Sequence, residues 1–256
     1  MKIAVAGGTG RVGRHAVDVL KARGHSVVTI SRSNGVDIIT GKGLADALEG
    51  VECVVDAASG PSPEEKSATE FFTTATRNLE QAGTRAGVKQ MIVVSIIGID
   101  RFTSGYAAAK VAHEKAMRAG PIPVRILRAA QFHEFVGQLV EWGRKGDVSY
   151  LQEMRTQLVA ARTVAEALAD LATTGSMAGA RSADGKILEI AGPREESLVD
   201  AARRLVARRG DRLRIEGVSD PANPGAALYE SGALLPGPDA VLAGPTFDAW
   251  LEETVR

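Results

Sequence analysis

The stretch KIAVAGGTGRVG near the start of the chain constrains its fold more than any other feature. Residues 3–6 are an apolar run bounded by glycines, which is typical of a short buried strand. Behind the glycines, apolar residues recur at helical spacing at Val12, Ala16, Val17 and Leu20. We therefore expect a helix from about Gly10 or Arg11 to about Gly24. A strand, a glycine turn and a helix in this order favour an α/β fold with parallel strands.

The glycines of this turn suit the demands of dinucleotide binding. One lets the strand turn sharply, one lets the backbone approach a pyrophosphate, and one lets helix and strand pack closely. Unpaired N–H groups and the helix dipole favour an anion there. The spacing is G-x-x-G-x-x-G rather than G-x-G-x-x-G, and a plain tight turn is the alternative, although it would not need three glycines. The expected cofactor contacts are Gly7, Thr9, Gly10, Arg11, Val12 and Gly13.

The end of the second predicted strand bears on the choice between NAD and NADP. Residues 25–31, HSVVTIS, are rich in β-branched side chains and predict that strand. NAD sites usually carry Asp or Glu at its end, whereas this chain has Ser31, Arg32 and Ser33. A carboxylate would repel a 2′-phosphate, while Arg and Ser can bind one, so we expect NADPH to be preferred. An ordinary exposed loop arginine is the alternative interpretation of Arg32.

Two further segments complete the expected cofactor site. Residues 36–39 are an apolar run that predicts a third strand, and Asp37 within it could accept from the adenine amino group. Asp is also a common turn residue. Residues 51–56 predict the next strand, and the small residues Ala57, Ala58 and Ser59 follow it, so that a ligand can lie against the backbone.

A second group of candidates follows the predicted strand QMIVVS, residues 90–95. Ser95 ends this strand, and Tyr106 and Lys110 project from one face of the next predicted helix at i and i+4. In parallel sheets the pocket lies beyond the carboxyl ends of the strands, where Ser95 would lie. A phenol is a poor acid at neutral pH, but a neighbouring ammonium and an oxidised nicotinamide would lower its pKa.

These motifs together resemble the short-chain dehydrogenase/reductase superfamily. The stretches VVSIIGIDR, GYAAAK, ILRAAQFHEF, AARTVAEAL and TFDAWLEE resemble more specifically its atypical, NmrA-like NAD(P)-binding branch, so the resemblance covers nearly the whole chain. It implies a Rossmann-type, doubly wound parallel sheet, NADPH binding and a small C-terminal substrate lobe. Some members of the branch are reductases, and others bind the cofactor as redox sensors without turnover.

The chain departs from the family pattern in two places. The family commonly has Asp at the start of the helix near position 163, where this chain has Thr163. Thr163 and Glu166 still predict a capping box. Ser95 and Tyr106 are also closer in sequence than in most dehydrogenases of the superfamily, which weakens the role of Ser95 more than that of Tyr106.

The C-terminal part, about 131–256, is expected to supply the substrate lobe of a single domain spanning 1–256, interleaved with the last sheet strands. Residues 123–128 and 186–190 predict two of these strands. Gln131, Phe132 and His133 follow the first of them and are expected to line the nicotinamide and substrate pocket. His133 is either a proton shuttle or a hydrogen-bonded histidine at a helix start. Residues 220–237 are rich in Pro and Gly and predict an irregular lid.

Composition excludes several classes of function. Lys and Arg number 31, as do Asp and Glu, so neither nucleic acid nor an acidic membrane is indicated. No apolar run reaches the ~18 residues of a membrane span, and the N-terminal apolar run is too short for a signal peptide. The single cysteine, Cys53, lies in an apolar run and predicts a buried, reduced thiol. We therefore expect a cytoplasmic protein that is a monomer or a homodimer. No metal site is expected, since the four histidines are scattered along the chain.

The first functional interpretation is an NADPH-dependent reductase of a small carbonyl or quinone-like substrate. Tyr106 would protonate the substrate oxygen, Lys110 would lower the pKa of Tyr106 and hold the nicotinamide ribose, and Ser95 would position the oxygen. The second is an NADP-binding redox sensor without turnover. A third, an epimerase or dehydratase with bound NAD, usually implies a larger sugar-nucleotide lobe than this chain can supply.

Overall fold

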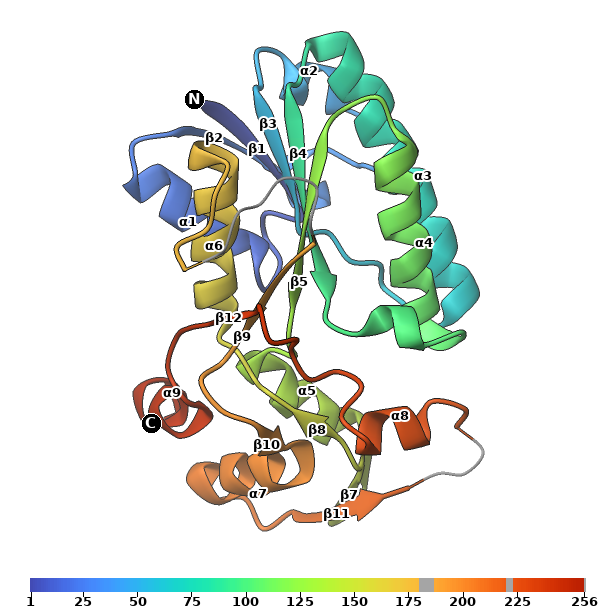
Figure 1. Cartoon of the computed structure of the whole chain (residues 1–256), viewed down its shortest axis with the longest axis vertical. Helices are drawn as coiled ribbons and strands as arrows, with labels where there is room; N and C mark the ends of the chain where they lie inside the picture. The colour runs from blue at the N-terminus through green and yellow to red at the C-terminus, as the bar shows by residue number, and fades with distance from the viewer. Residues whose placement is uncertain (180–186, 220–222, 256) are drawn as a thin grey trace. The chain divides into compact units, whose positions relative to one another are not determined.

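A seven-stranded sheet carries the fold, in the order β12-β9-β5-β4-β3-β1-β2 (Figure 1). The computed structural model describes residues 1–179, 187–219 and 223–255. The sheet strands are β1 Lys2–Ala6, β2 Ser26–Ile30, β3 Cys53–Asp56, β4 Gln90–Ile96, β5 Val124–Ala129, β9 Leu188–Ala191 and β12 Val241–Leu242. β1 pairs in parallel with both β2 and β3, so the strand order reverses beside it. The predicted Rossmann-type α/β fold is therefore confirmed.

Helices alternate with these strands along the chain. Their bounds are α1 Gly13–Ala22, α2 Leu44–Leu48, α3 Glu65–Ala86, α4 Gly105–Ala119, α5 His133–Trp142, α6 Ala161–Thr174, α7 Leu198–Arg209, α8 Ala226–Glu230 and α9 Phe247–Thr254, with short 3-10 turns η1 Arg32–Asn34 and η2 Ile99–Arg101. α3 and α4 cover one face of the sheet, and α1 and α6 cover the other (Figure 1). Smaller strands pair as β11 Arg214–Val218, β7 Val148–Gln152 and β6 Arg144–Lys145, and as β10 Glu196–Ser197 with β8 Arg155–Thr156.

The chain divides into two compact units. The first unit comprises residues 1–95, 103–128 and 164–188, and the second comprises 96–102, 129–163 and 189–256. The first unit holds the glycine turn, Ser95, Tyr106 and Lys110. That the second unit is a substrate lobe stays a prediction.

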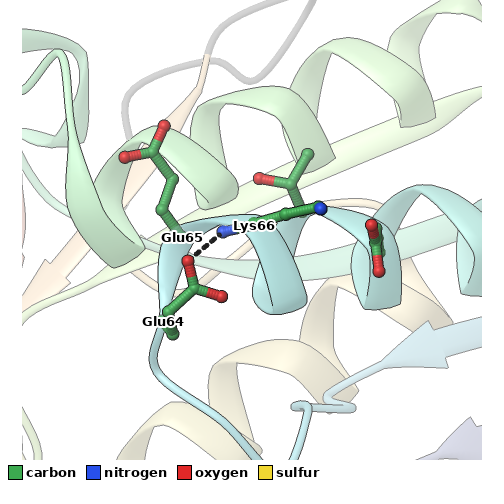
Figure 2. A pocket seen from close by; sticks show the side chains of 5 residues that line it. Glu64, Glu65 and Lys66 are labelled. Carbon is green, nitrogen blue, oxygen red and sulfur yellow. Dashed lines mark hydrogen bonds between the residues drawn. The ribbon is translucent and has the colours of Figure 1, made fainter.

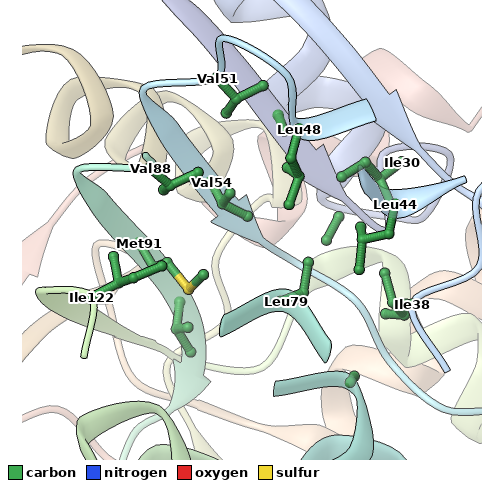
Figure 3. Packing of buried hydrophobic residues seen from close by; sticks show 14 of the residues in the cluster. Ile30, Ile38, Leu44, Leu48, Val51, Val54, Leu79, Val88, Met91 and Ile122 are labelled. Atoms are coloured by element: carbon green, nitrogen blue, oxygen red, sulfur yellow. The ribbon is translucent and has the colours of Figure 1, made fainter. Parts of the chain in front are cut away.

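The long helix α3 packs one face against the core of the first unit. Its buried residues recur at helical spacing, at Ala68, Phe72, Ala75 and Leu79. Leu79 packs with Leu44 of α2, Val54 of β3 and Met91 of β4 in one apolar cluster (Figure 3). The Glu64 carboxylate caps the start of α3 by accepting from two backbone amides, and Gly87 ends the helix with φ of 75°.

The second unit has its own apolar core between α5, α7 and α9. Its buried members include Val136, Leu205, Phe247 and Leu251. The hydroxyl of Ser197 caps α7 and that of Thr246 caps α9, each by accepting from a backbone amide. Across the described ranges, no helix combines the length and apolar character needed to cross a membrane.

The third strand predicted over residues 36–39 is wrong. These residues form a turn in which Asp37 Oδ1 accepts from the Ile39 amide at 2.8 Å. The Asn78 side chain of α3 donates to the carbonyls of Ile38 and Ile39 at 2.9 and 2.8 Å. Ile38 is nevertheless buried in the core of the first unit. The run is therefore apolar because the turn is buried, and not because it pairs in the sheet. The Asn78 side chain takes the place of a neighbouring strand as hydrogen-bond donor to its carbonyls.

The capping box predicted at Thr163 and Glu166 is also wrong, because α6 already begins at Ala161. The Glu134 carboxylate of α5 accepts from the Ala161 amide at 3.1 and 3.3 Å. A side chain 27 residues away therefore caps this helix, which local spacing does not reveal.

The strand predicted over 186–190 corresponds to β9, and Lys186 lies outside the described residues. A further strand, β12, pairs with β9 in parallel and forms the edge of the sheet. Residues 220–222 of the predicted lid also lie outside the described residues, and residues 226–230 of the rest form the short helix α8.

Candidate functional site

The turn between β1 and α1 is packed so closely that three of its glycines, Gly7, Gly8 and Gly13, admit no side chain. A Cβ added at Gly13 would lie 2.1 Å from the Gly7 carbonyl oxygen, and one added at Gly7 would lie 2.7 Å from Ala58 Cα. Gly7 also has φ of 70°. At Gly10, in contrast, an added Cβ would meet a single neighbour, the Gly7 carbonyl oxygen at 3.0 Å. Gly7 and Gly13 are therefore required by packing, whereas Gly10 is not.

The start of α1 suits an anion. Its N-cap residue, Val12, provides no side-chain hydrogen bond to the first turn, and Thr9 and Gly10 are exposed. The amides and dipole of an uncapped helix start attract negative charge. The residues present thus fit a pyrophosphate, and the approach of its phosphates to Gly10 stays a prediction.

The end of β2 carries a cluster of polar side chains and no carboxylate. The hydroxyls of Ser31 and Ser33 lie 2.9 Å apart, and they approach Asn34 Oδ1 at 3.1 and 3.2 Å. Arg32 is exposed beside them on η1. Asp37 is occupied by its hydrogen bond to the Ile39 amide. Sequence reasoning missed Asn34, although its place after Arg32 and Ser33 could have suggested it.

The segment after β3 lies against the glycine turn. The Ala57 amide donates to the Ala6 carbonyl at 3.0 Å, and Ala58 Cα is among the atoms that a Cβ at Gly7 would strike. Ala57 and Ala58, which are predicted to lie beside the cofactor, are therefore next to the glycine turn that is predicted to bind it. Ser59 follows them directly in the chain.

Tyr106 lies in the first turn of α4. The Gly105 amide donates to Glu65 Oε2 at 2.7 Å, which ties the start of α4 to the start of α3. The Tyr106 ring packs edge-on against Phe72, with ring centroids 5.8 Å apart. Burial raises the pKa of the Tyr106 phenol to about 12.

Lys110 is a buried cation directed into the first unit. Its side chain is 4% exposed, and Nζ donates to the Val94 carbonyl at 2.9 Å. Nζ also lies 2.9 Å from His113 Nδ1 and 4.5 Å from the centre of the Phe72 ring. Burial lowers the pKa of Lys110 to about 8, although the charges of Asp56 and Glu114 oppose this. In this structure burial alone raises the pKa of the Tyr106 phenol, and the expectation that Lys110 lowers that pKa stays a prediction for the cofactor-bound site.

His113 and Asp56 belong to the same buried group, and sequence reasoning missed both. His113 Nε2 lies 3.2 Å from Asp56 Oδ2, and both side chains are almost fully buried. The His113 ring stacks on Phe72 at 4.5 Å. Burial raises the pKa of Asp56, but its contacts with His113 and the Ala58 amide outweigh this and hold it below its usual value. His113 follows Lys110 by three residues, so the helical period that linked Tyr106 to Lys110 could have found it.

Ser95 lies in β4 as predicted and is 3% exposed. Within the described part of the chain, its hydroxyl has no hydrogen-bond partner. A buried hydroxyl without a partner is costly, which is consistent with a site that a ligand completes. The bond from Lys110 to the Val94 carbonyl attaches α4 to β4 at the residue before Ser95.

The three predicted pocket residues lie in the second unit. Gln131 Oε1 accepts from the Thr156 hydroxyl at 2.6 Å, and Phe132 is the N-cap residue of α5. His133 begins α5, is fully buried and stacks on Phe247 and Trp250. Burial lowers the pKa of His133 to about 4, although the Pro245 carbonyl opposes this. His133 is therefore a neutral core histidine, and the pocket assignment stays a prediction.

A surface depression of about 410 Å³ lies at the start of α3 (Figure 2). Its lining residues are Glu64, Glu65, Lys66, Thr69 and Glu70. Three carboxylates and one ammonium make it unsuited to an anionic cofactor. Figure 2 shows the Glu64 carboxylate bonded to the Lys66 amide, which assigns this residue to capping. Among the described residues, no cluster of three or more His, Cys, Asp or Glu side chains is arranged to hold a metal.

A family model described as NAD(P)H-binding matches residues 7–174, and the chain therefore belongs to this family of NAD(P)H-binding proteins. The NAD(P)H-binding part of the resemblance found in the sequence is therefore confirmed. The fold is shared with a solved short-chain dehydrogenase/reductase superfamily protein with bound NAD.

One curated relative is the photosystem II assembly factor Ycf39 of Synechocystis sp. (strain ATCC 27184 / PCC 6803 / Kazusa). It is 30% identical over 111 residues, which is 38% of this chain. The match spans 34% of the length of that relative.

Solved structures with the same fold include enzymes of several kinds. MoeE5 in complex with UDP-glucose and NAD has a TM-score of 0.66 and 18% identity, covering 100% of this chain and 94% of that one. UDP-N-acetylglucosamine 4-epimerase from Bacillus cereus has a TM-score of 0.65 and 17% identity, covering 99% and 97%. The Citrobacter sp. triphenylmethane reductase complexed with NADP(H) has a TM-score of 0.62 and 20% identity, covering 91% and 87%. At these identities the likeness shows the shared fold.

Proposed function

We propose that the protein is an NADPH-dependent oxidoreductase that reduces a small carbonyl or quinone-like substrate. The observation that carries this proposal is the pair Tyr106 and Lys110 on the buried face of α4, in a chain of an NAD(P)H-binding family. Ser95 on β4 supports the proposal, because its buried hydroxyl has no hydrogen-bond partner among the described residues and is free to bind a substrate oxygen.

The first unit offers residues for each part of the cofactor. The uncapped turn with Gly10, Arg11 and Val12 would hold the pyrophosphate. Arg32 with Ser33 would hold the 2′-phosphate, and Lys110 the nicotinamide ribose. When bound, a reduced nicotinamide supplies the hydride.

Tyr106 is the proton donor in this proposal. Its raised pKa keeps the phenol protonated at neutral pH, so the proton is available when negative charge develops on the substrate oxygen. The Ser95 hydroxyl would donate a hydrogen bond to that oxygen and fix its position. The Lys110 ammonium, one turn further along α4, would stabilise the phenolate that remains.

The test is to replace Tyr106 by Phe. We expect Tyr106→Phe to keep NADPH affinity and to lose about 10²–10⁴-fold in turnover, because only the hydroxyl is removed and the ring still packs on Phe72. Quinones, aldehydes and ketones are screened by the loss of NADPH absorbance. Tyr150→Phe is the matched control, since Tyr150 is exposed in the second unit.

A substrate reduced equally well by wild type and Tyr106→Phe would refute the acid role. Lys110→Ala is expected to weaken both NADPH binding and turnover, because Lys110 is assigned to the ribose as well as to the phenolate.

A redox sensor without turnover is the second candidate. The observation that favours it is the direction of the Lys110 ammonium, which binds the Val94 carbonyl and His113 while the pKa of Tyr106 remains high. In that case the broad substrate screen finds no turnover, and NADPH changes the affinity for a protein partner. A cytoplasmic location and a monomeric or homodimeric state also stay predictions.

A further inference from the structure

We infer that His113, itself held by Asp56, is the residue that positions the Lys110 ammonium. The inference deepens the proposed function, and its importance for cofactor binding rests on the role proposed there for Lys110. Neither Asp56 nor His113 belongs to the Ser, Tyr and Lys group that the sequence motif defines.

The contacts form a buried chain of three ionisable groups. Lys110 Nζ lies 2.9 Å from His113 Nδ1, and His113 Nε2 lies 3.2 Å from Asp56 Oδ2. Asp56 is anchored in turn, because its Oδ1 accepts from the Ala58 amide at 3.0 Å. The side chains of Asp56, Lys110 and His113 are 2%, 4% and 1% exposed, so no bulk water competes for these contacts.

The arrangement fixes the tautomer of His113. The Lys110 ammonium has only donors, so His113 Nδ1 must accept, and the ring proton is on Nε2. Nε2 lies 3.2 Å from Asp56 Oδ2 without the geometry of a hydrogen bond, so the contact between His113 and Asp56 is electrostatic. A neutral imidazole thus stands between an ammonium and a carboxylate. Burial and the Lys110 charge lower the pKa of His113, which keeps the ring neutral. The order of groups resembles that of a catalytic triad, because a carboxylate orients a histidine, which in turn orients a functional group, here the Lys110 ammonium.

Other groups around Lys110 do not replace His113. From α3 comes the Phe72 ring, and β4 contributes only the Val94 carbonyl. Glu114 on α4 is engaged by Arg128 of β5 in a two-point ion pair, with both N–O distances at 3.0 Å. Tyr106 is the remaining titratable group on the same face of α4. His113 is therefore the side-chain contact that holds the ammonium, and Asp56 is its counter-charge.

The test follows the titration of Lys110 in the cofactor-free protein. Protein labelled with ¹³C,¹⁵N-lysine is titrated by NMR, and Lys110→Arg assigns the resonance. We expect Asp56→Asn to move the Lys110 midpoint down by roughly one pH unit or more, because a nearby opposite charge favours the ammonium. His113→Leu is expected to move it in the same direction, since the acceptor is lost. His113→Asn retains an acceptor near the position of Nδ1, so its Lys110 midpoint is expected to lie between that of His113→Leu and that of wild type.

Glu80→Gln is the matched control, because it removes another buried carboxylate of the first unit that accepts instead from the Ile122 amide. It is expected to leave the Lys110 midpoint unchanged. Circular dichroism and thermal melting establish that each variant is folded, and Asp56→Asn, which is nearly isosteric, decides the matter if His113→Leu does not fold. A Lys110 midpoint unchanged in folded Asp56→Asn overturns the inference.

A second measurement separates this inference from the proposed function. NADPH affinity is measured for the same variants by calorimetry. If the Lys110 midpoint moves and NADPH affinity falls about tenfold or more, the positioning of Lys110 by His113 and the ribose role of Lys110 are both supported. If the midpoint moves and affinity does not, the positioning by His113 is supported and the ribose role of Lys110 is refuted.

Discussion

At the scale of single residues, we predict that the choice of cofactor rests on Arg32. It lies exposed on η1 beside Ser31 and Ser33, and this end of β2 carries no carboxylate. We predict that wild type binds NADPH more tightly than NADH and that Arg32→Ala weakens NADPH binding by about 1.5–3 kcal/mol, because a charge-assisted contact to the 2′-phosphate is lost. NADH binding should change little. Calorimetric titration with both cofactors measures the two effects.

The control for this prediction is Arg85→Ala, which removes an exposed arginine from the last turn of α3. It should leave both affinities as in wild type. Equal affinity of wild type for NADPH and NADH would contradict the assignment of Arg32.

At the scale of elements, the β1–α1 turn contains glycines required by packing and one glycine, Gly10, that packing does not require and that we predict is needed for cofactor binding. A Cβ at Gly13 would lie 2.1 Å from the Gly7 carbonyl oxygen, whereas at Gly10 the same atom would lie at 3.0 Å. We predict that Gly13→Ala lowers the melting temperature markedly, since backbone must shift to admit the methyl group. Gly10→Val should fold, with at most a small loss of stability, and lose NADPH binding.

Thermal melting and NADPH titration of the two variants give the comparison. Wild-type NADPH affinity in Gly10→Val would mean that the phosphates bind elsewhere. A Gly13→Ala variant as stable as wild type would mean that the turn is more adaptable than its packing indicates.

At the scale of the whole molecule, two buried neutral histidines set the response to acid. The folded-state pKa of His133 is about 4, below the usual value near 6.5, so the unfolded chain binds its proton more readily. The associated stability is complete above about pH 6.5 and is lost as pH falls toward 4. His113, whose pKa is also lowered, acts in the same direction, and Asp56 adds a further loss only at still lower pH.

We predict that His133 alone accounts for a loss of about 2 kcal/mol of unfolding free energy between pH 7.5 and pH 5. His133→Phe should flatten this dependence, because the ring stays in the stack with Phe247 and Trp250 but takes up no proton. Denaturant unfolding at pH 7.5, 6 and 5 measures the slope for both proteins. Parallel pH profiles for wild type and variant would contradict the prediction.

The sequence by itself determined the elements whose signals are local. The glycine turn lies between the predicted strand and the predicted helix, because these elements rest on backbone geometry or on one amphipathic face. The helix itself is shorter than predicted, since it begins at Gly13 rather than at Gly10 or Arg11. The same local logic identified Tyr106 and Lys110, which are one turn apart. It failed at residues 36–39, where an apolar run is buried without pairing in the sheet.

Only the tertiary structure decided the features made by contacts between distant segments. Glu134 caps α6 from α5, and Asn78 satisfies the carbonyls of a turn some 40 residues earlier. Asp56 meets His113 because β3 and α4 are brought together in the first unit. The direction of Lys110 and the raised pKa of Tyr106 follow from burial, which a residue acquires from its whole surroundings. Residue types and spacing fix which groups are available, but the packed fold determines which of them meet and what charge they carry.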